Sequence, residues 1–332
     1  MNLVIKKNAV IGQLGGPTSV INSSLSGLIQ EGLKSKRIKH ILGMRDGIIG
    51  LLKDEIVALE KINPKTIKAW CHTPSSILGS CRYILNNKDF PLILKQFKKY
   101  NIGFVFLIGG NGFLEVNRQI EQYCKKNGYQ INIIGIPNTV DNDLCNTDHV
   151  PGFASAAKYI CLSVLQGGRL ARDMRSIDKF VILQTIGRST GWLAASSALA
   201  KRKETDAPHL IYIPEKPLSR KKFLSDVKDC IKKYGWAYIV CGEGILWEDK
   251  NFVANHYSPD HREKEFGAMG GGSAALSLHK AIFQELNCRG EFQITESLPM
   301  CAIDRASKVD IEEAYACGVK AIKLVEEGVS GV

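Results

Sequence analysis

Two aspartates that lie two residues apart, Asp141 and Asp143, are the side chains of this sequence best suited to chemistry. They follow the apolar run of residues 131–136, which predicts a buried strand, so they stand on a loop at the carboxyl end of that strand. One carboxylate there can accept a proton from a hydroxyl nucleophile, and the other can hold a magnesium ion or its waters. The structural alternative is an Asx turn, in which Asp and Asn side chains bond their own backbone.

Two glycine-rich turns precede predicted helices and suit phosphate binding. Residues 12–19 follow the apolar run 8–12, and residues 109–112 follow the run 103–108. Glycine lets the backbone approach a ligand closely, and the helix that follows offers free N–H groups and the positive end of its dipole. Neither turn has the spacing of a Walker loop or of GxGxxG, and each alone has a packing turn as its alternative. Two of them on the same edge of one parallel sheet favour a phosphate site.

Charged residues near other predicted strand ends would complete such a site. Arg188 follows a strand end, where its guanidinium can bond a phosphate through two N–H groups, and Glu243 follows another, where a carboxylate suits sugar hydroxyls. Each has a surface ion pair as its structural alternative. The same holds for three further candidate anion clamps, Arg82, Lys179 and Arg305. Together with the aspartates and the glycine turns, these residues indicate phosphoryl transfer to a sugar phosphate.

The elements that must position these residues alternate along the chain. Short apolar runs are separated by helical patterns such as residues 20–33, whose apolar side chains fall on one helix face. Near-continuous apolar strands between helices predict an α/β fold with two doubly wound parallel sheets, each covered by helices on both faces. The predicted strands are residues 8–12, 103–108, 131–136, 179–186, 209–213 and 237–241.

The length of 332 residues predicts two domains. We expect a phosphoryl-donor-binding domain made of residues 1–145 and about 265–305. A sugar-phosphate-binding domain is expected from about 146–264 and 306–332. Residues 328–332 look like the start of a turn into a further strand, so we expect the C-terminus to be truncated.

Composition and charge exclude several other classes of protein. Hydrophobic residues make up 45% and charged residues 23% of the chain, as in globular proteins. No apolar run reaches the roughly 18 residues of a membrane span, and the N-terminus has no signal-peptide pattern. The ten cysteines occur singly and indicate reduced thiols in a cytoplasmic protein. The net charge of +11 is spread over predicted helix faces, so we expect neither a nucleic acid nor a membrane as partner.

These segments, in this order, resemble the phosphofructokinase family, whose members phosphorylate the 1-hydroxyl of fructose 6-phosphate in glycolysis. The resemblance runs from about residue 8 to the C-terminus, and it is specific because it rests on a series of motifs rather than on one. The motifs are IGQLGGPTSVINSSL, LGSCRY, IGGNGF, IPNTVDNDL, DHVPGFASAAKYI, TIGRSTGWLAASSALA, PHLIYIPE, CGEG and DRASKVDIEEAY.

The resemblance implies a role for each candidate residue. Asp141 is the general base on the sugar hydroxyl, while Asp143 supports it and, with Asn111, binds Mg²⁺. Thr139 and Arg82 complete the implied catalytic group. Donor-binding residues are implied at Gly15, Arg82, Tyr83, Gly110, Asn111 and Gly112. Substrate-binding residues are implied at Thr139, Asp141, Lys179, Ile186, Gly187, Arg188, Glu243 and Arg305.

Two positions bear on the phosphoryl donor. Family members with an aspartate after the GGD or GGN triplet exclude ATP and use pyrophosphate, whereas this chain has Gly112 there. Pyrophosphate users also carry a lysine where this chain has Asn138. We therefore expect an Mg²⁺-dependent 6-phosphofructokinase that uses ATP. The alternative is a pyrophosphate–fructose 6-phosphate 1-phosphotransferase, because the surrounding sequence is more similar to that branch.

Further departures from the family pattern keep a second class of function open. Phe113 stands where Ser or Thr is usual, and residues 294–297 replace an Arg-bearing segment, for which Arg305 is a substitute. A non-catalytic regulatory paralogue that binds a phosphosugar or a nucleotide is the alternative to an enzyme. In some members the residue that matches Lys179 reaches the substrate from a neighbouring subunit, so we expect a homodimer or homotetramer.

Overall fold

The computed structural model describes residues 6–254 and 272–332, and the chain divides into two compact units. The expected domain boundary near residues 264–265 lies outside the described residues. Unit 1 comprises Met1–Thr139, Leu144–Ser155 and Met300–Val332, and unit 2 comprises Val140–Asp143 and Ala156–Pro299.

Unit 1 holds a five-stranded sheet of order β3-β2-β1-β4-β5, parallel except for the edge strand β3, which is antiparallel to β2. The strands are β1 (Lys7–Gln13), β2 (Ile38–Met44), β3 (Ile56–Ala58), β4 (Ile102–Gly109) and β5 (Asn132–Pro137). The helices are α1 (Ile21–Gly32), α2 (Ile48–Leu52), α3 (Pro64–Ala69), α4 (Asp89–Lys99), α5 (Asn111–Lys126) and α10 (Lys308–Glu326). Short 3₁₀ helices occupy Leu59–Lys61, Trp70–His72 and Ile303–Arg305, and a further one, Leu298–Met300, spans the last two residues of unit 2 and the first residue of the C-terminal part of unit 1.

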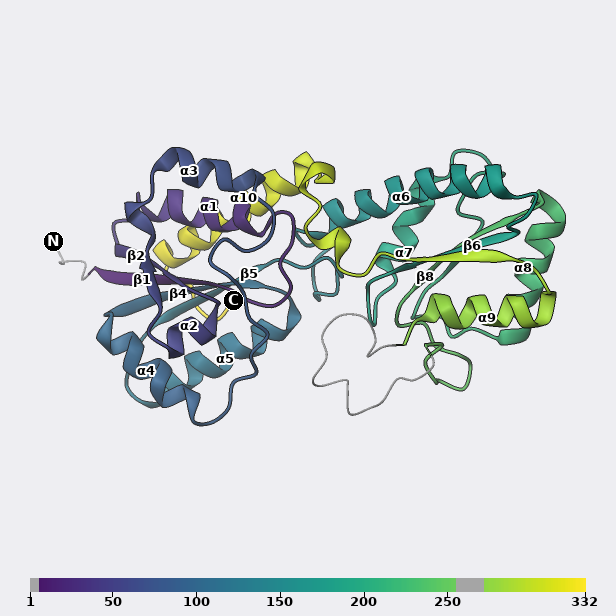
Figure 1. Ribbon diagram of the computed structural model, residues 1–332. Coiled ribbons are helices and arrows are strands. Elements are labelled where there is room, and N and C mark those ends of the chain that lie inside the picture. The colour runs from purple at the N-terminus through teal and green to yellow at the C-terminus, as the bar shows by residue number, and fades with distance from the viewer. Residues whose placement is uncertain (1–5, 255–271) are drawn as a thin grey trace. The chain divides into compact units, whose positions relative to one another are not determined.

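Helices cover both faces of this sheet (Figure 1). Helices α1, α3 and α10 lie on one face, and α2, α4 and α5 lie on the other. Successive side chains of a strand point to opposite faces, so Ile11 of β1 packs with the first group and Val10 packs with the second. The central strands are therefore apolar almost throughout, which is why they stood out in the sequence.

Unit 2 holds a four-stranded parallel sheet of order β7-β8-β6-β9. Helices α6 and α7 pack on the face of Val181, and α8 and α9 pack on the face of Phe180 and Ile182. The strands are β6 (Phe180–Thr185), β7 (Leu210–Tyr212), β8 (Ala237–Gly242) and β9 (Gly290–Ile294). The helices are α6 (Phe153–Met174), whose first three residues belong to unit 1, α7 (Trp192–Ser196), the 3₁₀ helix Ser197–Ala200, α8 (Arg220–Tyr234) and α9 (Ala274–Leu286).

The two helix-covered sheets confirm the predicted α/β class. Every predicted strand is present, whereas β2, β3 and β9 were not predicted. These strands were missed because none of them is a continuous run of buried apolar residues. Only four of the seven residues of β2 are buried, and none in β3 or β9 is.

The C-terminal part of the chain departs from the expected division. Met300–Val332 belongs to unit 1, whereas residues 306–332 were expected in the second domain and 265–305 in the first. The reason is the packing of α10 along α1, where glycine lets the two backbones touch. A Cβ on Gly318 would lie 2.1 Å from the carbonyl oxygen of Ser24. The helix that ends the chain is therefore part of the core of unit 1.

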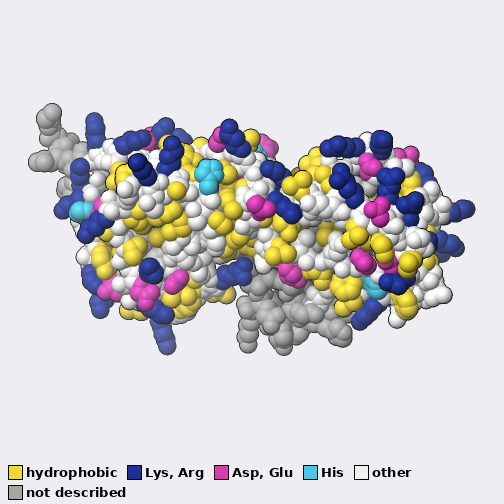
Figure 2. Space-filling view, turned by 45° about the horizontal axis from the view of Figure 1, so that its top comes forward, with side chains coloured by type: hydrophobic (Ala, Val, Ile, Leu, Met, Phe, Trp, Pro, Cys, Tyr) yellow, Lys and Arg dark blue, Asp and Glu magenta, His cyan; other side chains and the backbone are white. Residues whose placement is uncertain are grey.

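The surface of the described residues carries charges of both signs. Figure 2 shows Lys and Arg side chains scattered over the visible face among Asp, Glu and apolar side chains, not gathered in one tract. Within residues 6–254 and 272–332, no helix combines the length and the apolar character that crossing a membrane requires.

Candidate active site

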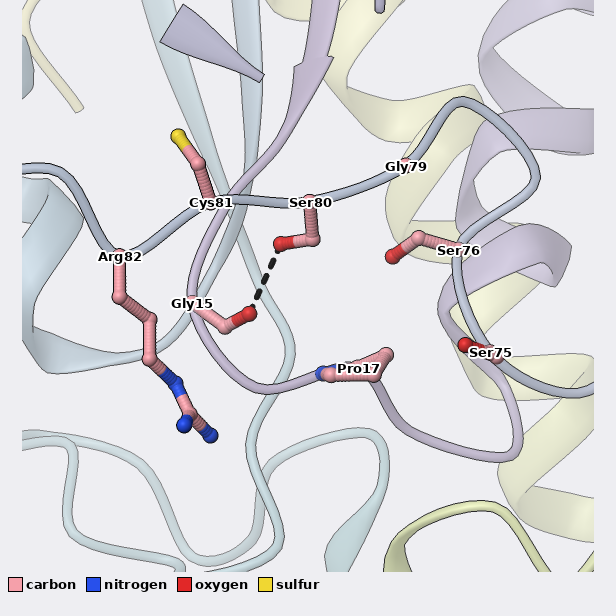
Figure 3. A pocket seen from close by; sticks show the side chains of 8 residues that line it. All are labelled: Gly15, Pro17, Ser75, Ser76, Gly79, Ser80, Cys81 and Arg82. Atoms are coloured by element: carbon pink, nitrogen blue, oxygen red, sulfur yellow. Dashed lines mark hydrogen bonds between the residues drawn. The ribbon is translucent and has the colours of Figure 1, made fainter. Parts of the chain in front are cut away.

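The first glycine turn, between β1 and α1, is tied to the segment that carries Arg82. Gly15 has a left-handed φ of 78°, a conformation that would strain a side chain. Its N–H donates to the carbonyl oxygen of Cys81 at 2.9 Å, and the Ser80 hydroxyl donates to the Gly15 carbonyl oxygen at 2.8 Å (Figure 3). The turn and the arginine segment are thus held side by side, as the predicted donor site requires.

A pocket of about 450 Å³ lies at these two segments (Figure 3). The Arg82 guanidinium lies against the glycine turn, because a Cβ on Gly16 would come within 3.2 Å of Arg82 Nη2. Ser76 contributes a buried hydroxyl oxygen without a hydrogen-bond partner. A guanidinium, hydroxyls and close backbone suit an anionic ligand. The pocket is lined by Gly15, Pro17, Ser75, Ser76, Gly79, Ser80, Cys81 and Arg82.

Sequence reasoning identified Gly15 and Arg82 of this pocket but missed its serines. The available signal was the run of small polar residues that precedes the arginine, from Ser75 to Ser80. Tyr83 was predicted here but is not among the lining residues. The residue is 37% exposed, and its hydroxyl accepts a hydrogen bond from Asn86 Nδ2 at 3.0 Å.

The second glycine turn lies at the carboxyl end of β4, where α5 begins at Asn111. Asn111 and Gly112 are exposed, and a Cβ on Gly112 would meet nothing within 4 Å, so open space lies beside this residue. A Cβ on Gly110 would lie 3.2 Å from the Cβ of Thr139. The structure therefore brings Gly110 and Thr139 together at neighbouring strand ends of unit 1.

Asp141 and Asp143 stand together in unit 2, with Arg188 near them. The pKa of Asp141 is raised to about 6, chiefly by burial and in addition by the negative charge of Asp143, while the positive charge of Arg188 opposes the rise. The Thr190 hydroxyl donates to the backbone carbonyl oxygen of Asp141 at 2.7 Å. Between the two aspartates, Asn142 is buried with a left-handed φ of 54°. The loop is thus a fixed turn that holds an acidic pair beside one guanidinium.

Glu243 follows β8 and reaches the residues that follow β6. Its Oε1 accepts the N–H of Gly187 at 3.2 Å, while its buried Oε2 has no hydrogen-bond partner. The residue is only 4% exposed, and burial raises its pKa to about 7. Arg188 and Asp141 act on the same pKa in opposite directions, so Glu243, Gly187, Arg188 and Asp141 form one cluster. Ile186 is half-buried beside Gly187.

One predicted residue of unit 2, Lys179, is not brought into this cluster. Lys179 precedes β6, and its Nζ donates to the carbonyl oxygen of Arg175 at 2.8 Å. Arg188 follows the same strand, whose six residues separate the two by roughly 20 Å at about 3.3 Å per residue. Arg305 belongs to unit 1, where it pairs with Asp304 at 3.6 Å. Within one copy of the chain, Lys179 does not reach the acidic pair.

A comparison with protein families places the chain in a known group. The family model described as phosphofructokinase matches residues 8–323. The pyrophosphate–fructose 6-phosphate 1-phosphotransferase of Halomonas elongata is 35% identical over 97% of this chain and 77% of the relative. The sulfofructose kinase of Alkalicoccus urumqiensis is 34% identical over 97% of this chain and 81% of the relative. The ATP-dependent 6-phosphofructokinase of Glaesserella parasuis is 28% identical over 69% of this chain and 66% of the relative.

Solved structures give the same result. The pyrophosphate-dependent phosphofructokinase of Nitrosospira multiformis superposes with a TM-score of 0.88 and 33% identity, covering 98% of this chain and 78% of that one. The departures from the family pattern at Gly112 and Asn138 therefore occur in a chain whose fold is similar to that of solved pyrophosphate-dependent enzymes.

Proposed function

Because the chain belongs to the phosphofructokinase family, we propose that it transfers a phosphoryl group to the 1-hydroxyl of fructose 6-phosphate and forms fructose 1,6-bisphosphate. The observation that carries the proposal is the environment of Asp141. Its raised pKa of about 6, beside Asp143 and Arg188, is that of a carboxylate that is ionised at neutral pH yet takes up a proton readily. A buried carboxylate beside a second carboxylate and a guanidinium, with its pKa shifted toward neutrality, is an arrangement that suits a general base.

In this mechanism the residues of unit 2 bind and activate the acceptor. Asp141 takes the proton of the 1-hydroxyl as the oxygen attacks the terminal phosphorus of the donor. The new P–O bond forms as the bond to the leaving group breaks, which is ADP if the donor is ATP and phosphate if the donor is pyrophosphate. The unpartnered Oε2 of Glu243 accepts a hydrogen bond from a sugar hydroxyl, and Arg188 offsets the charge of the substrate phosphate. These groups supply positioning and charge, which dominate phosphoryl transfer.

The residues of unit 1 bind the donor. Arg82 and the backbone at Gly15 offset the charge on its phosphates. In the described part of the chain no three His, Cys, Asp or Glu side chains form a ready-made metal cluster. The acidic pair nevertheless fits Mg²⁺, because the repulsion that raises the pKa of Asp141 is relieved by a cation. Asp143 would hold the ion together with oxygens of the donor, and when bound the ion neutralises phosphate charge.

Two observations bear on the donor, and they favour different molecules. Similarity over nearly the whole chain to proteins named as pyrophosphate-dependent favours pyrophosphate. The open space beside Gly112 favours ATP, because an ATP α-phosphate needs the room that an aspartate would fill. Both donors are therefore candidates for the same transfer, and one assay separates them.

A second acceptor is favoured by a specific feature of unit 2. Glu296 stands in the segment where relatives carry a phosphate-binding arginine, and its negative charge is one of those that raise the pKa of Glu243. A sulfonate carries one negative charge, whereas a phosphate monoester carries nearly two at neutral pH. A site with one cation fewer suits the sulfonate, and one relative is named a sulfofructose kinase. Sulfofructose is therefore the second candidate acceptor.

The test is a matrix of two acceptors and two donors in the presence of Mg²⁺. Bisphosphate formation from fructose 6-phosphate with either donor supports the proposal, and the donor that works identifies the branch. Turnover of sulfofructose but not of fructose 6-phosphate would show that sulfofructose is the acceptor. Asp141→Asn is the matched control, because it keeps the shape of the side chain and removes the base. Substrate binding by calorimetry without turnover in any combination would indicate the non-catalytic paralogue instead.

A further inference from the structure

Asp310 is a buried carboxylate that the mechanism above does not use. It lies in the first turn of α10 and is 0% exposed. Burying a carboxylate costs free energy of folding unless its oxygens accept hydrogen bonds. The hydrogen-bond partners of Asp310 therefore indicate its role. They are on the chain segment that enters α6, far from α10 in the sequence.

Asp310 holds the first turn of α6 through both of its oxygens. Oδ1 accepts the N–H of Gly152 at 2.9 Å, and Oδ2 accepts the backbone N–H of Ser155 at 2.9 Å and its hydroxyl at 2.5 Å. The Ser155 hydroxyl in turn accepts the N–H of Ser307 at 3.1 Å. The first N–H groups of a helix have no partner inside it, and only a group whose two oxygens both accept can serve all three donors.

The segment that Asp310 holds fixes Thr139 in turn. The N–H of Thr139 donates to the carbonyl oxygen of Pro151 at 3.0 Å, and Thr139 and Gly152 form a parallel β-bridge. Gly152 has a φ of 111°, and a Cβ on it would lie 2.9 Å from the Thr139 carbonyl oxygen. A continuous series of contacts thus runs from the carboxylate through Gly152 to Thr139, two residues before Asp141.

We propose that Asp310 is a positioning residue for the phosphoryl transfer, which holds Gly152 and thereby places Thr139 and the loop that carries Asp141. The inference rests on the proposed function, because Thr139 and Asp141 act on substrates only in that reaction. Reacting groups must be held to a fraction of an ångström, and a displacement of about 1 Å costs about 100-fold in rate. Asn cannot replace Asp310, because its NH₂ group would face an N–H or O–H donor.

The test is the Asp310→Asn variant, assayed with the donor that the wild-type chain uses. We expect kcat to fall by about 10- to 100-fold, while KM for acceptor and donor changes by less than about threefold. Hydrogen–deuterium exchange, which needs no turnover, is expected to be faster over residues 138–155 and unchanged over 315–326 of α10. The matched control is Glu312→Gln, because Glu312 lies on the same helix and its exposed carboxylate pairs with Lys308 of that helix at 3.8 Å. It is expected to leave kcat and exchange unchanged.

The outcomes separate this proposal from the proposed function. A folded Asp310→Asn variant with kcat within twofold of wild type would overturn the positioning role. So would faster exchange throughout α10, which indicates a structural role only. If the wild-type protein turns over no substrate but exchange in the variant is faster over residues 138–155 alone, the positioning role of Asp310 is supported and the proposed function is wrong. If Asp310→Asn does not fold, Gly152→Ala tests the link to Thr139, and an unchanged kcat in that variant would also overturn the proposal.

Discussion

Thr18 and Asn138, 120 residues apart in the sequence, are joined by a buried hydrogen bond of 2.5 Å from the Thr18 hydroxyl to Asn138 Oδ1. The hydroxyl oxygen also accepts the N–H of Val20 at 3.2 Å, so its proton is free to go to Asn138. This arrangement fixes which way the Asn138 amide points. The bond connects the first glycine turn to the strand end that precedes the acidic pair.

Removing this bond is expected to destabilise unit 1. Thr18→Val keeps the side-chain shape but removes the hydrogen-bond partner of Asn138 Oδ1 and of the Val20 N–H. Leaving a buried polar group without a partner lowers the free energy of unfolding by about 1–3 kcal/mol. Thr18→Ser keeps the hydroxyl and is the matched control. Urea unfolding of the three proteins measures the difference. Equal midpoints for Thr18→Val and wild type would show that the bond adds no stability.

The pH dependence of turnover is expected to follow Asp141. With a pKa of about 6, the base is protonated and inactive below that pH, so kcat/KM falls on the acid side of pH 6. Asp143→Asn removes the negative charge that raises the pKa of Asp141, so the acid limb of the kcat/KM profile is expected to move to lower pH. The maximum rate is expected to fall, because Asp143 supports the base. The profile between pH 5 and 8 measures both effects. Asp148→Asn, on the same loop, is the control, and an acid limb that stays in place in Asp143→Asn would contradict the assignment.

Stability is expected to depend on pH through the same group. The pKa of Asp141 is about 6 in the folded chain and 3.8 in its usual range, so folding favours its protonated form. That stabilisation is complete below pH 3.8 and is lost as pH rises through 6. Asp141→Asn cannot ionise, so it should unfold with a free energy up to about 3 kcal/mol higher than wild type at pH 7.5, and with a smaller difference at pH 4.5. A constant difference across this range would exclude a raised pKa.

The open space beside Gly112 makes the donor preference testable. Gly112→Asp places a carboxylate where nothing lies within 4 Å, so folding is not expected to suffer. Turnover with ATP should fall more than about tenfold because of repulsion and lost room, whereas turnover with pyrophosphate should change little. Gly112→Ala fills the space without the charge and is the matched control. Equal losses with both donors would show that Gly112 does not select between them.

The position of Lys179 predicts complementation between copies of the chain. A side chain roughly 20 Å from Arg188 along β6 can reach an acceptor only in a second copy. Lys179→Ala and Asp141→Asn should each be inactive alone, and co-refolded mixtures should recover up to about a quarter of wild-type activity if they form random dimers. Measured activity of the mixture against each variant checks this. Full activity of Lys179→Ala alone would remove the residue from the site.

The strongly buried parts of the fold could be predicted from the sequence, and the weakly buried ones could not. β4 has eight buried residues in a row, and such a run is visible in any window. β2 interrupts its burial with exposed Lys39 and His40, and it begins within a basic run that reads as a solvated surface. The ends of the predicted strands could be placed for the same reason, and Arg188 and Glu243, which follow β6 and β8, lie in one cluster with Asp141.

The rest of the site depends on distances that a sequence does not contain. Lys179 and Arg188 are only nine positions apart, but an extended strand turns that spacing into opposite ends of a sheet. Asp310 lies on a helix among other acidic residues, where a carboxylate is usually solvated. Only the packing of α10 against the start of α6 shows that it is buried and bonded. Ser76 belongs to a loop, and its hydroxyl becomes part of a pocket only through the fold.

The division of the chain into two units affects which residues a genetic exchange would replace together. Apart from Val140–Asp143, unit 2 is one continuous stretch, Ala156–Pro299, set into a chain that is otherwise unit 1. A genetic exchange of that stretch would replace Arg188 and Glu243 in a single event and leave Asp141 in the recipient. Under the proposed function, the acceptor-binding residues Arg188 and Glu243 would therefore be exchanged together, while the proposed base and donor-binding loops would stay with the recipient gene.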